Sequence, residues 1–209
     1  MVVLDIGALI LMGGKNSRMN GNVKGFLKLN DSTFLERIKD TLDDFSNIYL
    51  SINDKFSKNQ KQDFKQMGFK LIEDIYKEIG PLGGIYSSLL NCKEEYLFIT
   101  ACDMPFITKK NIEVLCDKIN ENIDIVVFCD KHGRLYPLSA IYSKKVLPII
   151  EEMIGKKYYK LSYLIEKSNF VKINIEDTDI KLETLSNINT PQEYDSLKKK
   201  IEYSPSESV

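Results

Sequence analysis

A glycine-rich segment that carries basic side chains is the first place in this sequence where chemistry is expected. The letters LILMGGKNSRMNGNVKG run from Leu9 to Gly25, and an apolar stretch ends there at Gly13–Gly14. Adjacent glycines let main-chain N–H groups approach an anion, Arg18 adds a planar pair of donors, and Lys24 adds a mobile positive charge. The segment matches neither GxxxxGK(S/T) nor GxGxxG. It predicts an anion-binding loop of another kind, with an ordinary glycine turn as the alternative.

A carboxylate stands where another apolar run ends. The letters EYLFITACDMPFIT lead into Asp103, and Pro105 follows. A carboxylate beside bound phosphates is a typical ligand of Mg²⁺, which takes one or two carboxylates together with phosphate oxygens. The alternative is an aspartate that caps a turn. Cys102 precedes Asp103, but the sole histidine, His132, lies in the turn-like DKHGRLYP and is expected to be exposed, so a catalytic cysteine is not expected.

The segment EIGPLGGIYSSLL combines chain breakers with glycines. Gly80 and Pro81 interrupt the chain, and Gly83 and Gly84 precede an apolar helix. Glycines at the start of a helix let a sugar or a base lie against the backbone. A purely structural cap explains the same letters equally well.

The segment SNINTPQEY has the composition of a helix start. Thr190 is the expected cap, Pro191 takes the first helical position, and Glu193 completes a capping box. This structural role accounts for those three residues. It leaves Asn189 free to face a ligand.

Short apolar runs alternate with helical patterns along the chain. Helices are expected at 34–45 with Asp31 or Ser32 as cap, at 109–120 with Thr108 as cap, and at 144–155, 158–168 and 190–203. Strands are expected at Ile6–Met12, Ile48–Ile52, Lys70–Glu73, Tyr96–Ala101, Ile123–Cys129, Leu138–Tyr142 and Val171–Ile175. The alternation predicts an α/β fold with a mostly parallel central sheet and helices on both faces.

This fold class predicts where the candidate residues meet. Ligands bind beyond the carboxyl ends of strands in such sheets. Residues 13–24 follow the first expected strand, Asn53 the second, Asp74 the third, and residues 102–105 the fourth. These polar groups are therefore expected at one edge of the sheet.

Composition narrows the class of protein. The 209 residues are 43% hydrophobic, which suits one domain over residues 1–200 with a disordered tail over 201–209. With 29 basic and 30 acidic side chains, the net charge of −1 gives no support for nucleic-acid binding. The four cysteines form no CxxC pair, and the apolar N-terminus lacks the basic start of a signal peptide. A cytoplasmic protein with reduced thiols and no membrane contact is expected.

Several segments, taken together and in order, indicate a protein family more specifically than any one of them does. They are LMGGKNSRM, Lys24, IED ending at Asp74, GPLGGI, ACDMP, GRLYPLSAIY and NINTPQEY. The chain thereby resembles the molybdenum cofactor guanylyltransferases, within the broader nucleotidyltransferase superfamily, from about Leu9 to Tyr194. The first loop and CDMP occur in many nucleotidyltransferases, whereas GPLGGI, PLSAIY and NINTP point to this family.

The resemblance implies a reaction and its participants. It implies a three-layer Rossmann-like nucleotidyltransferase fold that transfers GMP from GTP to the terminal phosphate of Mo-molybdopterin and releases pyrophosphate. Mg²⁺ is the implied cofactor, GTP and molybdopterin are the implied substrates, and molybdenum cofactor delivery proteins or apo-molybdoenzymes are implied transient partners. Because the attacking phosphate is already anionic, the chemistry requires alignment and charge cancellation rather than a strong base.

The resemblance also implies roles for residues. Arg18, Lys24 and Asp103 are the implied catalytic groups, Asp103 is the implied Mg²⁺ ligand, and Asn189 is a further candidate ligand. Asn53 and Asp74 face the guanosine, and GRLYPLSAIY belongs to the acceptor side. The implied nucleotide-binding residues are Leu11, Met12, Gly13, Gly14, Lys24, Asn53, Asp74, Gly83 and Asp103.

Two departures from the family pattern affect the first loop. The family often has LAGG and RMG, whereas Met12 and Asn20 stand here, with Gly21 one place later.

Two other classes of function stay open. One is another nucleotidyltransferase, such as a molybdopterin cytidylyltransferase or a nucleotide-sugar pyrophosphorylase. The other is a non-catalytic nucleotide-binding assembly protein, against which the joint presence of Arg18, Lys24 and Asp103 argues.

Overall fold

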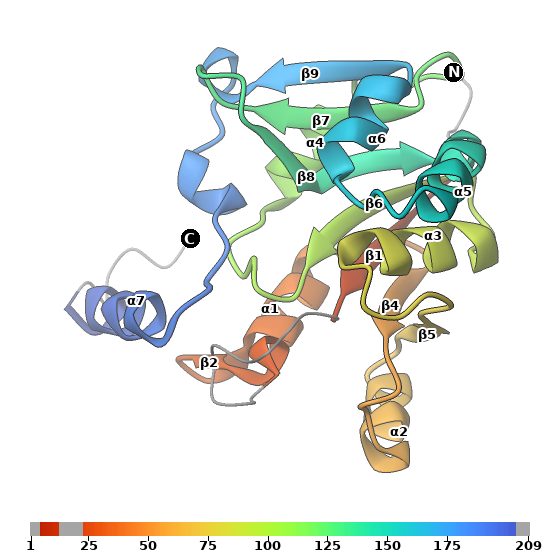
Figure 1. The fold of residues 1–209 in the computed structure, drawn as a ribbon. Coiled ribbons are helices and arrows are strands. Elements are labelled where there is room, and N and C mark those ends of the chain that lie inside the picture. The colour runs from red at the N-terminus through yellow and green to blue at the C-terminus, as the bar shows by residue number, and fades with distance from the viewer. Residues whose placement is uncertain (1–4, 13–22, 204–209) are drawn as a thin grey trace.

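A seven-stranded sheet runs through the centre of the molecule in the order β5-β4-β1-β6-β8-β7-β9 (Figure 1). The structure is a computed structural model that describes residues 5–12 and 23–203, with side chains through residue 199. The strands are β1 Ile6–Leu11, β4 Ile48–Ile52, β5 Lys70–Glu73, β6 Tyr96–Ala101, β7 Ile125–Cys129, β8 Leu135–Ser143 and β9 Phe170–Asn174. β8 pairs antiparallel with β6 and β7, whereas the other pairs are parallel. The predicted mostly parallel sheet is confirmed.

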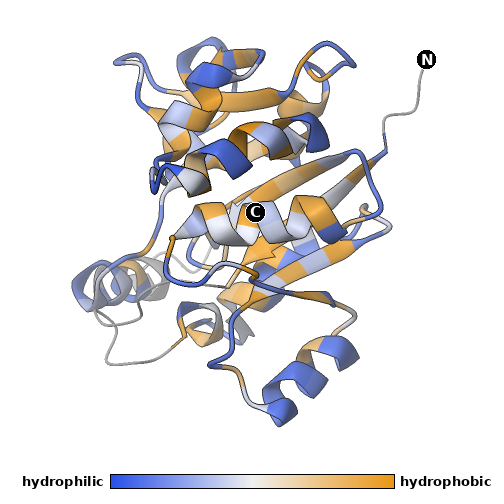
Figure 2. Ribbon diagram, turned by 45° about the vertical axis from the view of Figure 1, so that its right-hand side comes forward, coloured by the Kyte–Doolittle hydropathy of each residue, from blue (hydrophilic) through white to orange (hydrophobic). Residues whose placement is uncertain are grey.

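Helices cover both faces of this sheet and complete three layers (Figures 1 and 2). The α-helices are α1 Phe34–Thr41, α2 Lys58–Gln66, α3 Pro81–Asn91, α4 Lys109–Cys116, α5 Leu147–Gly155, α6 Leu161–Lys167 and α7 Pro191–Tyr203. Buried side chains of α1, α2 and α4 pack on one face, and those of α3, α5 and α6 pack on the other. No helix in the described ranges is long and apolar enough to cross a membrane.

The alternation of side chains along the central strands builds both layers of the core. Ala8 and Ile10 of β1 face the α1 side, whereas Leu9 and Leu11 face the α3 side. Successive side chains of a strand point to opposite faces, so a strand that is buried on both faces is apolar at nearly all positions. This explains why β6 reads YLFITA and is buried throughout.

The residues that cap the helices agree in part with those predicted from the sequence. Thr108 caps α4 as predicted, but α1 is capped by Thr33 rather than by Asp31 or Ser32. Thr33 forms a capping box with Glu36, and this pair satisfies two main-chain donors together. A helix that was not predicted from the sequence is α2, a polar helix whose buried residue is Phe64.

The last helix lies beside a small hairpin rather than on the main sheet. Strands β2 Lys28–Leu29 and β3 Ser32–Thr33 form this hairpin, and Tyr194 of α7 donates its hydroxyl proton to the Lys28 carbonyl at 2.6 Å. α7 continues to Tyr203, three residues into the segment 201–209 for which a disordered tail is expected. Residues 204–209 lie outside the described residues.

Candidate nucleotide and metal site

Four parallel strand ends lie level at one edge of the sheet. Leu11 at the end of β1 pairs with Ser51 of β4 and with Ala101 of β6, and Ile52 pairs with Glu73 of β5. The residues that directly follow these strands therefore reach the same edge. We call this edge, with Asn53, Asp74, Asp103 and the chain around them, the carboxyl rim.

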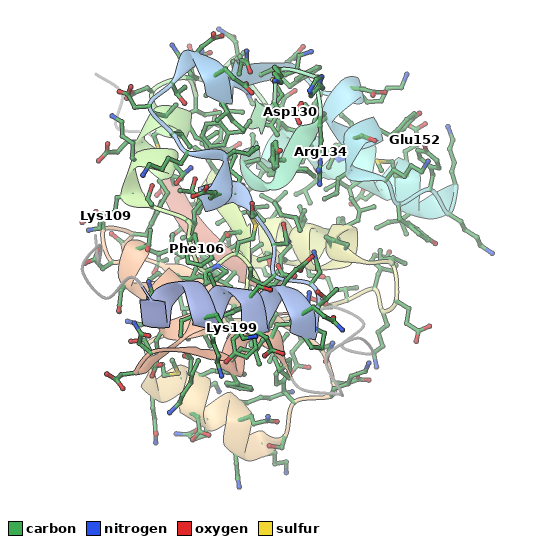
Figure 3. All side chains as sticks on the ribbon, turned by 90° about the vertical axis from the view of Figure 1, so that its left-hand side faces the viewer. Phe106, Lys109, Asp130, Arg134, Glu152 and Lys199 are labelled. Atoms are coloured by element: carbon green, nitrogen blue, oxygen red, sulfur yellow. The ribbon has the colours of Figure 1, made fainter. Side chains whose placement is uncertain are left out.

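The carboxyl rim extends past β8 to the hairpin between β7 and β8. Figure 3 looks onto this side, where α7 crosses below Phe106, and Asp130 and Arg134 mark the hairpin above. Asp130 Oδ1 accepts main-chain N–H groups of His132 and Arg134, each at 2.9 Å, which fixes the turn. His132 is exposed, as predicted. The segment GRLYPLSAIY thus begins at the same rim and continues as β8.

Asp103 is the centre of a polar cluster. Lys24 Nζ lies 2.8 Å from Asp103 Oδ2 and 2.8 Å from Asn189 Oδ1. On its other oxygen, Asp103 Oδ1 accepts a hydrogen bond from Asn187 Nδ2 at 2.8 Å. The side chains of Lys24 and Asp103 are only 15% and 14% exposed, so this ion pair is screened less than a surface pair.

One aromatic contact and one glycine contact fix the position of the backbone around Lys24. A short 3-10 turn, η2 Lys24–Phe26, follows the first loop. The ring of Phe26 stacks on Phe64 of α2 with centroids 5.8 Å apart, and a Cβ on Gly25 would lie 3.0 Å from Met12 Cε. A glycine therefore lets η2 sit against Met12. The buried Met12 side chain points into the α1-side core, where it supports η2 from below.

The two asparagines lie on an extended segment in which each of the residues 187, 188 and 189 forms a hydrogen bond with another segment. Ile188 is buried, and its N–H donates to the main-chain carbonyl of Asp103 at 2.8 Å. Asn187 and Asn189 lie on either side of it and reach Asp103 and Lys24. The Asn189 N–H donates to Glu193 Oε2 at 2.6 Å, and Glu193 also completes the predicted capping box at the start of α7.

Asn187 is a residue of this cluster that was not predicted from the sequence. The signal that could have found it is the alternation Asn-Ile-Asn, because an apolar residue between two polar ones in an extended chain turns both polar side chains the same way. Asn189 contacts Lys24 at the rim, and its role as a metal ligand remains a prediction.

The cluster suits a hard divalent cation. One carboxylate oxygen, Asp103 Oδ2, and one amide oxygen, Asn189 Oδ1, already converge on a single cationic nitrogen, that of Lys24. Such oxygens are preferred ligands of Mg²⁺, which completes its coordination with water and phosphate oxygens. In the described part of the chain no group of three or more His, Cys, Asp or Glu side chains could form an all-protein metal site. The donor set therefore fits a cation that arrives with phosphate ligands.

Asp74 occupies a different environment on the same rim. Ser51 donates its hydroxyl proton to Asp74 Oδ1 at 2.6 Å. Partial burial raises the pKa of the Asp74 carboxyl above its ordinary value, and the Ser51 hydrogen bond opposes this shift. α3 passes close by, since a Cβ on Gly84 would lie 2.5 Å from Ser51 Oγ and 2.8 Å from Leu11 Cδ2. Gly84 therefore lets the start of α3 reach the Asp74–Ser51 pair.

Gly83 and Asn53 each have a local structural role. A Cβ on Gly83 would lie 2.6 Å from the Tyr76 carbonyl oxygen, so backbone packing alone requires a glycine there. Asn53 Oδ1 accepts the Lys55 N–H at 3.1 Å and thereby closes the turn after β4. Contacts of Gly83, Asn53 or Leu11 with a nucleotide remain predictions.

Cys102 has no role as a nucleophile in this arrangement. Burial raises the pKa of its thiol to about 12, and the negative charge of Asp103 adds to that increase. A thiol that stays protonated at neutral pH is a poor nucleophile. This supports the sequence-based expectation that Cys102 is not catalytic.

Part of the predicted site falls in the first loop. Gly13, Gly14, Arg18, Asn20 and Gly21 lie outside the described residues. The chain enters that loop from Met12 and leaves it before Lys24, both at the carboxyl rim. The roles assigned to Gly13, Gly14 and Arg18 remain predictions.

The chain matches a family of known proteins over most of its length. The family described as the MobA-like NTP transferase domain matches residues 8–170. A probable molybdenum cofactor guanylyltransferase of Clostridium perfringens is 38% identical over 203 residues, which cover 93% of this chain and 97% of that protein. A molybdenum cofactor guanylyltransferase of Desulfosudis oleivorans is 30% identical and covers 90% of this chain and 92% of its own length.

Solved structures share the fold at lower identity. The molybdopterin-guanine dinucleotide biosynthesis protein A of Archaeoglobus fulgidus has a TM-score of 0.78 at 22% identity, covering 94% of this chain and 99% of that one. A cytidylyltransferase of Leptospira borgpetersenii has a TM-score of 0.68 at 17% identity, covering 96% and 87%. The fold alone therefore does not select the base. The family match and the relatives of 30–38% identity show that the chain belongs to the MobA-like NTP transferase family.

Proposed function

We propose that this protein transfers GMP from GTP to the terminal phosphate of the molybdenum cofactor. A phosphate oxygen of molybdopterin forms a bond to the α-phosphorus of GTP, the bond between that phosphorus and the β-bridging oxygen breaks, and pyrophosphate leaves. The product is the guanine dinucleotide form of the cofactor. The names of the relatives of 30–38% identity support the choice of GTP and of this acceptor.

The observation that carries the proposal is the convergence of Lys24, Asp103 and Asn189 at the carboxyl rim. Asp103 and Asn189 supply the oxygens that would hold Mg²⁺. When bound there with GTP, Mg²⁺ would neutralise charge on the phosphates. Lys24 supplies a further positive charge beside them, and Asn187 fixes the Asp103 carboxylate by holding its second oxygen. No described group is required as a base, since the acceptor phosphate is already anionic.

Asp74 is the proposed contact for the guanine base. Guanine presents two donors, N1–H and the exocyclic amine, on one edge, and a carboxylate accepts both. Cytosine presents an acceptor at N3 at that position. A partly buried carboxylate whose pKa is raised by burial would regain hydrogen bonds from guanine that it has lost from water. This favours GTP over CTP.

The same proposal includes the cellular setting. We expect the reaction in the cytoplasm, with transient contacts to molybdenum cofactor delivery proteins or apo-molybdoenzymes. These partners follow from the acceptor, which must be delivered, and from the product, which must reach the enzyme that uses it.

The proposal is tested by identifying the product. The protein is incubated with Mg²⁺, molybdopterin and one nucleoside triphosphate at a time, and the pterin product is identified by mass spectrometry. With GTP, we expect two products in equal amounts, the guanine dinucleotide cofactor and pyrophosphate. Efficient turnover with CTP instead would reassign the protein to the cytidylyltransferases. Turnover in a parallel incubation that contains a sugar phosphate in place of molybdopterin would make it a nucleotide-sugar pyrophosphorylase.

A further inference from the structure

The ammonium of Lys24 lies where a metal ligated by the carboxyl rim would have to be. It is 2.8 Å from both Asp103 Oδ2 and Asn189 Oδ1, the two oxygens that suit a divalent cation. Mg²⁺–oxygen distances are about 2.1 Å. A cation at that distance from both oxygens leaves no room for an ammonium that contacts the same two atoms, so the two cations exclude each other.

The Asp103 carboxylate cannot avoid this competition by turning. Its Oδ1 accepts the Asn187 amide at 2.8 Å, and its main-chain carbonyl accepts the Ile188 N–H at 2.8 Å. These contacts direct Oδ2 toward Lys24. The carboxylate therefore offers one oxygen to one cation at a time.

The Lys24 side chain can leave without moving its backbone. η2 is held by Gly25 against Met12 and by the stacking of Phe26 on Phe64. A lysine stem has four rotatable bonds, and its ammonium accepts new anionic partners readily. Phosphate oxygens on a bound nucleotide are such partners, and they would lie close to Lys24 because they ligate the same metal as Asp103 and Asn189.

We infer that Lys24 is the resident cation of the Asp103–Asn189 oxygen pair, and that a divalent cation displaces it only when nucleotide phosphates arrive to receive the ammonium. Free metal then binds weakly, because it must expel Lys24 without compensation. The metal–nucleotide complex binds well, because the displaced lysine forms a new ion pair with the phosphates. Lys24 thus selects for metal that enters together with its nucleotide.

This inference rests on the proposed location of the metal and the phosphates, but its test contains neither GTP nor pterin. Mn²⁺, which is visible by electron paramagnetic resonance, is titrated into the nucleotide-free protein as the probe. We expect Lys24→Met to bind at least about tenfold more tightly than wild type at one site, since the carboxylate has lost its competitor. In Lys24→Met/Asp103→Asn the gain should disappear. Lys24→Gln provides the same comparison with a polar side chain.

A matched control separates competition from a general change in charge. Lys61 pairs with Glu73 at 2.5 Å near the end of β5, so Lys61→Met also frees one carboxylate at the surface. We expect Mn²⁺ affinity to stay within about twofold of wild type in that variant. An unchanged affinity in both Lys24 variants, or an equal gain in Lys61→Met, would overturn the inference. Failure of the GMP-transfer assay alone would not, because the Mn²⁺ titration is independent of the acceptor and the base.

Discussion

Two aspartates stand at the ends of strands on the same rim, and their surroundings differ in kind. Asp103 follows β6 and contacts a lysine ammonium and an asparagine amide, both at 2.8 Å. Asp74 follows β5, is partly buried, and has the Ser51 hydroxyl as its side-chain partner within the described residues. No described lysine or arginine pairs with Asp74.

This difference indicates different ligands. A carboxylate held beside a cation and an amide oxygen is prepared for another cation. A carboxylate that has lost water and gained no positive charge is prepared for neutral hydrogen-bond donors, because they restore what burial removed. Position on the fold brings both aspartates to the rim, and the neighbours supplied by other segments decide what each can bind.

The largest effect is expected from Asp103→Asn. The substitution keeps the size of the side chain and removes the charge that the proposed Mg²⁺ requires, so the rate of pyrophosphate release from GTP should fall by about a hundredfold or more, equal to about 2.7 kcal/mol. The matched control is Asp43→Asn, which breaks a surface pair with Lys109 and should keep full activity. A folded Asp103→Asn protein with near-normal turnover would remove Asp103 from the metal site.

Asp74→Asn should change which base is preferred. The amide replaces one acceptor with a donor, which opposes a guanine donor and suits cytosine N3. Mispaired polar groups cost about 1–3 kcal/mol each, so the preference for GTP over CTP in kcat/KM should fall by about tenfold or more. Glu73→Gln alters the exposed neighbouring carboxyl and should leave the preference unchanged. If Asp74→Asn keeps the wild-type preference, the base binds elsewhere.

Gly84→Ala should disturb the surroundings of Asp74 and leave those of Asp103 unchanged. The added Cβ would lie 2.5 Å from Ser51 Oγ and 2.8 Å from Leu11 Cδ2. Overpacking of this kind costs about 1–3 kcal/mol, so urea unfolding should show a loss of that size. Gly155→Ala meets no atom within 4 Å and should be neutral or slightly stabilising. Equal stability of the two variants would show that α3 does not press on the Asp74–Ser51 pair.

The smallest expected effect is on stability and its pH dependence. Because burial raises the pKa of Asp74 above 3.8, this carboxyl favours the fold when protonated; that contribution is complete below pH 3.8 and is lost as pH rises through the raised pKa. At pH 7 the neutral amide of Asp74→Asn should therefore raise the Tm by about 1–3 °C. The gain should shrink as the pH is lowered through the raised pKa, because the wild-type carboxyl then takes up a proton and loses its charge. A lower Tm at pH 7 in Asp74→Asn would contradict a burial penalty on the charged carboxyl.

The central strands and the rim were predictable because they depend on local patterns. Short apolar runs bounded by turn residues locate the strands, and parallel strands end at one edge. Thr33 and α2 were not predicted, because Asp31, Ser32 and Thr33 are all good caps, and α2 buries only Phe64 and so lacks an apolar stripe. The capping box of Ser57 and Gln60 at the start of α2 is a local signal that could have indicated it.

Only those residues of the candidate site that stand in recognisable sequence motifs could be predicted. Lys24, Asp103 and Asn189 stand in recognisable segments, and the structure brings them together. Asn187 contacts Asp103 across 84 positions of sequence, so the Asn-Ile-Asn alternation could indicate which way the Asn187 side chain turns but not that Asp103 is its partner. The packing of Gly83 on the Tyr76 carbonyl and of Gly84 on Ser51 likewise depends on how α3 sits against the sheet.

The most direct test of two separate aspartate roles is the ratio of kcat/KM for GTP to that for CTP, measured for wild type, Asp103→Asn and Asp74→Asn under one Mg²⁺ concentration. We expect Asp103→Asn to lose most of its activity with both nucleotides and to keep the wild-type ratio. We expect Asp74→Asn to keep substantial activity and to lose most of the preference for GTP. A changed ratio in Asp103→Asn together with an unchanged ratio in Asp74→Asn would contradict the two assigned roles, because the residue assigned to the metal would then contact the base.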